Sequence, residues 1–433
     1  MNAKPIPFTN ESLYRYASQV LPGGVSAAAR AGKAVGGPFY MARGEGSRLH
    51  DIEGHEYIDL HTSHGAALLG HGHPQIKEAI AKSLEMGMLC AYETEAHGAV
   101  AKRLVDLLPG ADMIRFTATG TETTYYAVKL AREFTGRHKV LKFEGHFHGF
   151  NDYLQFNFWP TAENRYPKVS QETPGAPPGT EKHVIVLPFN DLDLLEDTLR
   201  QQGDEIAAVI LEPINYNSGG IRPLPGFLEA LRRLTSEKDI ILIFDEILSG
   251  FRTGPGCLQE YLGVTPDLFC IGKALGGGMP ISAFGGKKEI MEHVAPLGKV
   301  MHSGTYNAPL PCILAVNTFL DVITEPAFYD NLLKHCDLLY GGMGEIIQRL
   351  GIKCWIQATG ARFNMLFGLE KEPINYAESS QRDVATTVRF FDSARKHGIF
   401  FFDGWHHGIS AAHTQDDIQK ALEGIEAAMG EIA

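Results

Sequence analysis

Three segments in the middle of the chain carry residue types that could do chemistry. The first is DLFCIGKALGGGMP (267–280), where an apolar run delivers Lys273 and then three consecutive glycines. Lysine is seldom buried, and an amine held among apolar neighbours becomes a nucleophile that can form Schiff bases. The glycines would let the backbone approach a flat ligand. The ordinary alternative is a solvated lysine in a surface loop.

The second segment is IILIFDEILSGFR (240–252), where Asp245 directly follows an apolar run. A carboxylate at the end of a buried strand is costly unless it has a partner. Asp245 therefore needs a cation or an N–H group, and Arg252 is one candidate for an ion pair. Capping of the next helix is the ordinary alternative.

The third segment is FTATGTETTYYAVKL (116–130), which reads as a strand, a turn through Gly120 and a helix. Thr119 and Glu122 have the spacing of a capping box, which predicts a helix start near Thr121. Free N–H groups at a helix start, together with threonine hydroxyls, suit a phosphate. The alternative is a capped helix without a ligand. Combined with Lys273 and Asp245, this cradle describes a site for pyridoxal phosphate.

These segments belong to a stretch, about residues 112–290, in which apolar strands alternate with amphipathic helices. Such alternation predicts an α/β fold with a mostly parallel sheet covered on both faces. Ligands of such sheets collect beyond the carboxyl ends of the strands. The predicted strands are 113–118, 139–145, 206–213, 240–247, 268–274 and 281–286.

The rest of the chain predicts a second, smaller α+β domain. Residues 151–182 are rich in proline and glycine, and their aromatic residues favour an ordered lid. From about residue 320 the pattern is helical, with short strands between the helices. We expect an N-terminal segment 1–65 that belongs with the small domain, a large cofactor-binding domain 66–318 and a small domain 319–433.

Composition excludes several function classes. The 433 residues carry a net charge of −12, which argues against nucleic acid or an anionic membrane as the main partner. The N-terminal sequence lacks the apolar segment of a signal peptide, and no apolar run approaches the roughly 18 residues of a membrane span. Six cysteines without CxxC spacing are typical of reduced thiols, so we expect a cytoplasmic protein.

With these motifs in place, the sequence resembles the class III pyridoxal-phosphate aminotransferases, in particular the glutamate-1-semialdehyde aminomutase-like branch. The resemblance runs along nearly the whole chain. It implies fold type I and a homodimer with shared active sites. Its most specific pieces are GHGHP (70–74), TGTET (119–123), FEGHFHG (143–149), ILEPINYNSGG (210–220), FDEILSGFR (244–252), GKALGGGMP (272–280) and HSGT (302–305).

The resemblance also implies roles for single residues. Lys273 would carry the cofactor aldehyde and move protons as the catalytic amine, and Asp245 would contact the ring nitrogen. Phe147 stands where the family usually has a tyrosine stacked on the ring. The other implied cofactor residues are Thr119, Gly120 and Thr121 at the phosphate, Ile247 on the second ring face, Asn217 near the ring hydroxyl, Glu212 as structural support and Thr305 at the partner subunit's phosphate.

The substrate is less well specified by the sequence. Arg30 matches the arginine that holds the substrate carboxylate in semialdehyde aminomutases, and a surface arginine is the alternative. His64 stands where those enzymes carry tryptophan, and His406 or His407 where they carry glutamate. The segment around His64 is closer to D-phenylglycine and β-phenylalanine aminotransferases. With Trp405, these residues are the predicted substrate-binding set.

The sequence therefore predicts a transaminase that moves an amino group between an α- or β-amino acid, with an apolar or aromatic side chain, and a keto acid. An aminomutase, racemase or decarboxylase on the same framework is the alternative within the enzyme class. A non-catalytic pyridoxal-phosphate-binding protein is a further alternative. Histidine pairs at 71/73, 146/148 and 406/407 lack a third ligand at zinc spacing, so we expect no metal site.

Overall fold

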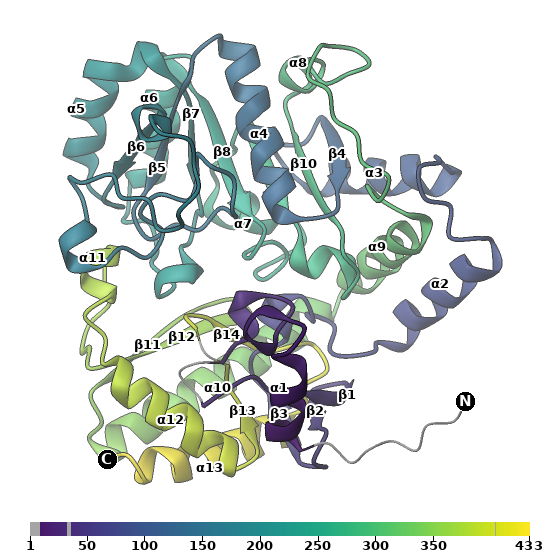
Figure 1. The fold of residues 1–433 in the computed structure, drawn as a ribbon, viewed down its shortest axis with the longest axis vertical. Helices are drawn as coiled ribbons and strands as arrows, with labels where there is room; N and C mark the ends of the chain where they lie inside the picture. Colours follow the sequence, from purple (N-terminus) through teal and green to yellow (C-terminus); the bar gives the residue numbers. More distant parts are fainter. Residues whose placement is uncertain (1–8, 33–35, 403) are drawn as a thin grey trace.

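The computed structural model describes residues 9–32, 36–402 and 404–433, and its largest sheet has seven strands (Figure 1). The strand order is β4-β10-β9-β8-β7-β5-β6. β10 is antiparallel to both of its neighbours, whereas the other neighbouring pairs are parallel. The strands are β4 (Met113–Thr117), β5 (Lys139–Phe143), β6 (Val184–Leu187), β7 (Ile206–Leu211), β8 (Ile241–Glu246), β9 (Leu268–Ile271) and β10 (Ser282–Gly286).

The mostly parallel α/β sheet is confirmed. Within this seven-stranded sheet, β6 is the one strand that the sequence pattern missed. β6 directly follows the proline-rich segment 151–182 and contains only four residues, VIVL. Its position depends on parallel pairing with β5, from Val140 opposite Val184 to Phe143 opposite Leu187. So short an apolar run does not distinguish a strand from a buried turn until its partner is known.

Both faces of this sheet are buried, which explains its nearly all-apolar strands. Along β8, Ile241 and Ile243 pack with helix α4 (Gly120–Thr135). The alternate residues Leu242 and Phe244 pack on the opposite face with α5 (Leu192–Gln202) and α6 (Phe227–Glu237). Successive side chains of a strand point to opposite faces, so helices on both sides require this composition.

Two smaller sheets lie below the large one in Figure 1. The four-stranded sheet has the order β1-β2-β3-β13 and joins both ends of the chain, because β13 is parallel to β3. The three-stranded sheet has the order β11-β12-β14. Their strands are β1 (Met41–Glu45), β2 (Arg48–Asp51), β3 (Glu56–Asp59), β11 (Cys354–Thr359), β12 (Arg362–Phe367), β13 (Ile399–Phe400) and β14 (His407–Gly408).

The remaining helices pack around these sheets. The boundaries 1–65, 66–318 and 319–433 stay a prediction. Among the described residues, no single helix is long and apolar enough to cross a bilayer. The helices Leu310–Ile323 and Phe328–Leu350 reach the required length and apolar composition only when counted together, and the chain is bent between them. These helices are α1 (Asn10–Ala17), α2 (Pro74–Glu85), α3 (Glu95–Leu107), α7 (Cys257–Leu262), α8 (Lys288–Met291), α9 (Leu310–Ile323), α10 (Phe328–Leu350), α11 (Tyr376–Ser379), α12 (Val384–Lys396) and α13 (Gln415–Gly430).

Segment 151–182 contains two short 3₁₀ turns and is held by side chains. The amide nitrogen of Asn157 donates to the carbonyl oxygens of Asn164 and Lys168, and its oxygen accepts from Ser170 N–H at 2.7 Å. The indole Nε1 of Trp159 donates to the carbonyl oxygen of Asn217 at 2.9 Å. These contacts give the predicted lid a fixed position over the loop that carries Asn217.

Candidate active site

A cavity of about 410 Å³ opens beyond the carboxyl ends of β5, β7, β8 and β9, beside the N-terminus of α4. Every cofactor residue predicted from the sequence lines it, except Thr305. The strand ends bring the lining residues together although they come from distant parts of the chain. The predicted residues in this cavity are Thr119, Gly120, Thr121, Phe147, Glu212, Asn217, Asp245, Ile247 and Lys273.

Lys273 follows β9 after a single residue, Gly272. Its φ of 44° lies in the left-handed region, which is costly for a residue with a side chain and recurs at functional sites. A Cβ at Gly272 would lie 2.5 Å from Ser282 Oγ and 3.0 Å from Ile247 Cδ1, so a side chain here would require both neighbours to move. Burial lowers the pKa of Lys273 to about 8, and the charges of Asp245 and Glu212 oppose that shift.

Asp245 lies near the end of β8 and is 4% exposed. Its Oδ2 accepts a hydrogen bond from His148 Nδ1 at 2.7 Å, and its Oδ1 accepts the N–H of Ile247 at 3.1 Å. Burial lowers the pKa of His148, although the hydrogen bond to Asp245 opposes the shift. A neutral imidazole therefore orients this carboxylate.

The ion pair between Asp245 and Arg252, which the sequence offered as an alternative, is not formed. The buried Arg252 guanidinium donates instead to the backbone carbonyl oxygens of Leu248 and Gly65. His148, which takes its place, was weighed in the sequence only as half of a histidine pair. His148 lies in the loop after β5, and β7 separates β5 from β8, so the contact depends on the order of strands in the sheet.

Glu212 joins two loops at the cavity wall. Its carboxylate accepts the N–H of Phe147 at 2.9 Å and the side-chain amide of Asn217 at 2.9 Å. Burial, followed by the nearby charge of Asp245, raises the pKa of Glu212 to about 8. The Phe147 ring is stacked on that of Trp159, with centroids 5.7 Å apart and planes 9° apart. Glu212 thus fixes the loop that presents Phe147.

The N-terminus of α4 has the predicted capping box. Thr119 Oγ1 accepts the N–H of Glu122 at 3.2 Å, and Glu122 Oε2 accepts the N–H of Thr119 at 3.1 Å. The first N–H groups of an α-helix have no acceptor within it, and those of Gly120 and Thr121 stand at the cavity. A Cβ on Gly120 would lie 3.1 Å from Ile247 Cγ2 and narrow the cavity between them.

Arg30 and His64 line a second cavity of about 490 Å³, with the rings of Phe39, Phe400 and Phe402 in the same wall. His64 has a φ of 52°, in the left-handed region. Burial lowers its pKa to about 4, and the positive charges of Lys273, Arg362 and Arg30 act in the same direction. His64 is therefore a neutral group close enough to both Lys273 and Arg30 to sense their charges.

The other predicted site residues lie outside both cavities. Thr305 is exposed. His406 is buried against Arg362, which donates to its ring Nδ1 and to its carbonyl oxygen. His407, in β14, packs its ring against Phe363, Phe391 and Phe401. The guanidinium of Arg382 covers the ring of Trp405 at 3.9 Å.

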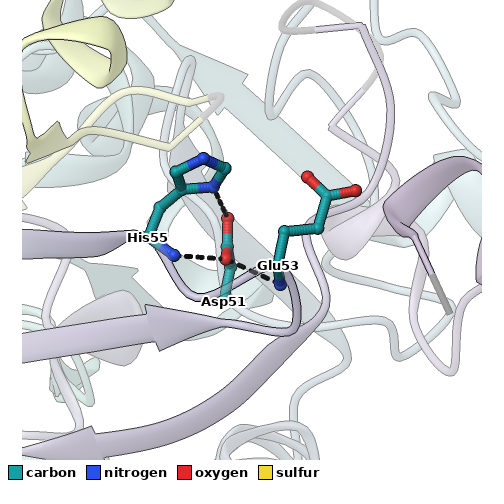
Figure 2. A group of neighbouring side chains, drawn as sticks. All are labelled: Asp51, Glu53 and His55. Carbon is teal, nitrogen blue, oxygen red and sulfur yellow. Dashed lines mark hydrogen bonds and ion pairs between the residues drawn. The ribbon is translucent and has the colours of Figure 1, made fainter. Parts of the chain in front are cut away.

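Three side chains that could share a cation, Asp51, Glu53 and His55, lie in the turn between β2 and β3 (Figure 2). Asp51 already accepts the N–H groups of Glu53 and His55 and contacts His55 Nδ1 at 2.9 Å. These bonds fix the turn, and the group lines a cavity other than that of Lys273.

A mostly parallel sheet with a lysine, a carboxylate and a capped helix start at its strand ends defines a fold-type-I pyridoxal-phosphate-dependent transferase. The family profile "Aminotransferase class-III" matches residues 30–424. The chain therefore belongs to the class III aminotransferases, and its cofactor is pyridoxal phosphate.

The similarity of the chain to individual proteins agrees with this family. A glutamate-1-semialdehyde 2,1-aminomutase of Methanosarcina acetivorans is 38% identical, with 96% of each chain covered. An omega-transaminase structure from Sphaerobacter thermophilus has a TM-score of 0.92 at 32% identity, covering 98% of this chain and 97% of the other. A solved transaminase with pyridoxal phosphate bound has a TM-score of 0.89 at 26% identity, with 98% and 97% covered.

The residues present fit this cofactor. The start of α4 offers N–H groups and hydroxyls for the phosphate, and Asp245 offers an acceptor for a protonated ring nitrogen. Phe147 and Ile247 supply apolar surface for a flat ring, and Lys273 supplies the amine. The buried Nε2 of His148 has no hydrogen-bond partner in the protein, so the cavity wall still has a polar group to satisfy.

Proposed function

We propose that this enzyme transfers an amino group between an α- or β-amino acid, with an apolar or aromatic side chain, and a keto acid. The observation that carries the proposal is the second cavity, where Arg30 faces the same space as Phe39, Phe400 and Phe402. A guanidinium binds a carboxylate through two parallel hydrogen bonds. Aromatic walls bind an apolar side chain.

The roles of the protein groups follow from their surroundings. With a pKa of about 8, Lys273 Nζ can accept the proton of the substrate carbon that bears the amine and return it. Pyridoxal phosphate supplies the ring that takes up the electron pair left on that carbon. Asp245, oriented by His148, would hold a proton at the ring nitrogen. Phe147, with Trp159 stacked behind it, covers one side of the cavity with an apolar ring.

A glutamate-1-semialdehyde aminomutase is the second candidate, because a 38% identical relative carries that name. The two reactions differ in their products. A mutase converts one semialdehyde to its isomer without a separate keto acid, whereas a transaminase releases a keto acid from its donor. Supplying purified holoenzyme with the semialdehyde alone, and separately with aromatic amino acids plus a keto acid, decides between them by product analysis.

The main test is Arg30→Ala, measured with an aromatic amino acid and with an amine of the same shape that lacks the carboxylate. If Arg30 binds the carboxylate, the variant should lose about 2–5 kcal/mol of transition-state stabilisation toward the amino acid, as measured by kcat/KM. Toward the amine the loss should be small. Arg30→Lys should rescue only part of the loss, because an ammonium makes no planar two-point contact.

Arg43 gives a matched control, because it is an exposed arginine in the wall of the same cavity. Arg43→Ala should leave the preference for the carboxylate in place. Equal losses of activity toward acid and amine in Arg30→Ala would remove Arg30 from substrate binding. Loss of the preference only in Arg43→Ala would assign the carboxylate to Arg43.

The proposal includes a cytoplasmic homodimer with shared active sites. Thr305 is exposed, and Met301 and Tyr306 beside it are both 66% exposed. Large apolar side chains on one surface segment favour burial against a second copy. All six cysteines are free thiols, which supports a reducing compartment.

A further inference from the structure

The strand β5 contains a fully buried lysine that the proposed chemistry does not use. Lys142 is 0% exposed. Its ammonium donates to the backbone carbonyl oxygens of His146 at 2.9 Å, Leu154 at 3.2 Å and Phe156 at 2.6 Å. An ammonium has three N–H donors and no acceptor. Burial lowers the pKa of Lys142 to about 7, and the charges of Glu172, Glu212 and Glu144 oppose that shift. The three carbonyl acceptors use all three N–H donors of the ammonium form, and hydrogen bonds from a charged donor are the strong ones.

The three acceptors lie in the segment that shapes the active-site wall. His146 immediately precedes Phe147 and His148, which line the cavity. Leu154 and Phe156 stand at the beginning of segment 151–182. The hydrogen bonds of Lys142 thus link the turn after β5 to the start of the lid.

A second side chain near the same strand end holds the lid farther along. Glu144 accepts the N–H of Tyr166 at 2.7 Å and the side-chain amide of Asn157 at 3.4 Å. Backbone bonding adds a further link, from Gly145 N–H to Asn157 O at 2.9 Å. The end of β5 therefore fixes both the beginning and the middle of the lid.

The lid in turn carries the ring of Trp159, which stands behind Phe147, a residue of the cavity wall. Trp159 stacks on Phe147 and donates its indole N–H to the carbonyl oxygen of Asn217, which belongs to the loop after β7. A shift of Phe156 would move Trp159, only three residues away. The position of this aromatic pair thus depends on the anchor beneath it.

We propose that Lys142 is a positioning residue for the reaction, whose three hydrogen bonds hold the lid and the Phe147–Trp159 pair in place at the cavity. The effect on cofactor binding rests on the proposed role of Phe147 in the proposed function, whereas the anchoring itself does not. The charged and titratable groups that face Lys142 are Glu144, Glu172, Glu212, His146 and His148.

The test replaces Lys142 by methionine, which keeps an unbranched apolar chain and removes every donor. Lys139→Met is the matched control, because Lys139 lies on the same strand and bonds Gln202 and Glu205 instead of the lid. The holoenzymes are digested briefly with trypsin, and cleavage after Arg165 and Lys168 is measured by mass spectrometry. We expect cleavage about tenfold faster in Lys142→Met, as for loss of about 1.4 kcal/mol of local stability, and unchanged in Lys139→Met.

Cofactor binding supplies the readout that general destabilisation would not give. In Lys142→Met the affinity of the apoenzyme for pyridoxal phosphate should fall about tenfold, because Phe147 supplies apolar surface for the cofactor ring and moves with the lid. In Lys139→Met this affinity should be unchanged. Lys142→Gln keeps two N–H donors and should restore part of both effects. It also serves as the test variant should Lys142→Met fail to fold.

Lid cleavage at the wild-type rate in a folded Lys142→Met or Lys142→Gln protein would overturn the proposal. Faster cleavage with unchanged affinity for pyridoxal phosphate would also overturn it, because the lid would then move without consequence for Phe147. Failure of the proposed function looks different. The wild-type enzyme would transfer no amino group from any donor, while the cleavage comparison would still show whether Lys142 anchors the lid.

Discussion

At the scale of single residues, burial sets the reactivity of Lys273. Its pKa of about 8 in the fold is below the 10.5 of a free lysine. We expect acylation of Lys273 in the apoenzyme, followed by peptide mapping, to rise with pH to a midpoint near 8. In the denatured chain the midpoint should lie near 10.5. A folded-state midpoint near 10.5 would show that the cavity does not activate this amine.

The same shift has a consequence for stability. Between pH 8 and 10.5 the unfolded chain binds a proton at Lys273 that the folded chain has already lost. Lys273 therefore destabilises the fold fully below about pH 8, and this cost is relieved as the pH rises through that window. The residue that we propose performs the chemistry is thus one that the fold holds at a cost.

The carboxylate of Asp245 is held in a fixed orientation without an ion pair to an arginine. Its two oxygens are oriented by His148 and by the backbone N–H of Ile247. A guanidinium at this position would compete with a ring nitrogen for the carboxylate. A neutral imidazole orients the group and leaves its charge available.

At the scale of elements, the start of α4 combines a cap with a binding site. Thr119→Ala removes the oxygen that accepts the N–H of Glu122. We expect a loss of about 1 kcal/mol in the free energy of unfolding, typical of a lost N-cap. We also expect weaker binding of pyridoxal phosphate, measured by titration of the apoenzyme.

Helix α13 provides the control, since Thr414 caps it with the same reciprocal pair of bonds to Asp417. Thr414→Ala should cost a similar amount of stability and leave the affinity for pyridoxal phosphate unchanged. Equal affinities in both variants would mean that the start of α4 does not bind the phosphate.

At the scale of the whole molecule, the role proposed for Thr305 at the partner subunit's phosphate predicts that two subunits complete one site. Lys273→Ala chains and Thr305→Ala chains, each of low activity, should regain activity when refolded together. In a mixed dimer with shared sites, one of the two sites contains neither change. Recovery should approach half the wild-type activity per mixed dimer. An active monomer in sedimentation, or no recovery on mixing, would contradict shared sites.

The sequence alone determined most of the fold and most of the cofactor cavity. Local patterns placed six of the seven strands of the large sheet, Lys273, Asp245 and the phosphate cradle at Gly120. The family resemblance added Phe147, Glu212, Asn217 and Ile247, which line the same cavity. The physical reason is that parallel strands end at one edge of their sheet. Residues such as Lys273, Asp245 and Gly120, each next to its own strand end, must therefore meet once the strands pair.

Only the tertiary structure decided contacts that reach across the sheet or between distant segments. Strand order allows His148 to reach Asp245 past β7, and it leaves Arg252 to bind backbone carbonyls. Pairing of β13 with β3 brings Phe400 into one cavity wall with Arg30. The position of β14 places the ring of His407 in the core, against Phe391. These outcomes depend on which segments become neighbours, and local periodicity carries no information about that choice.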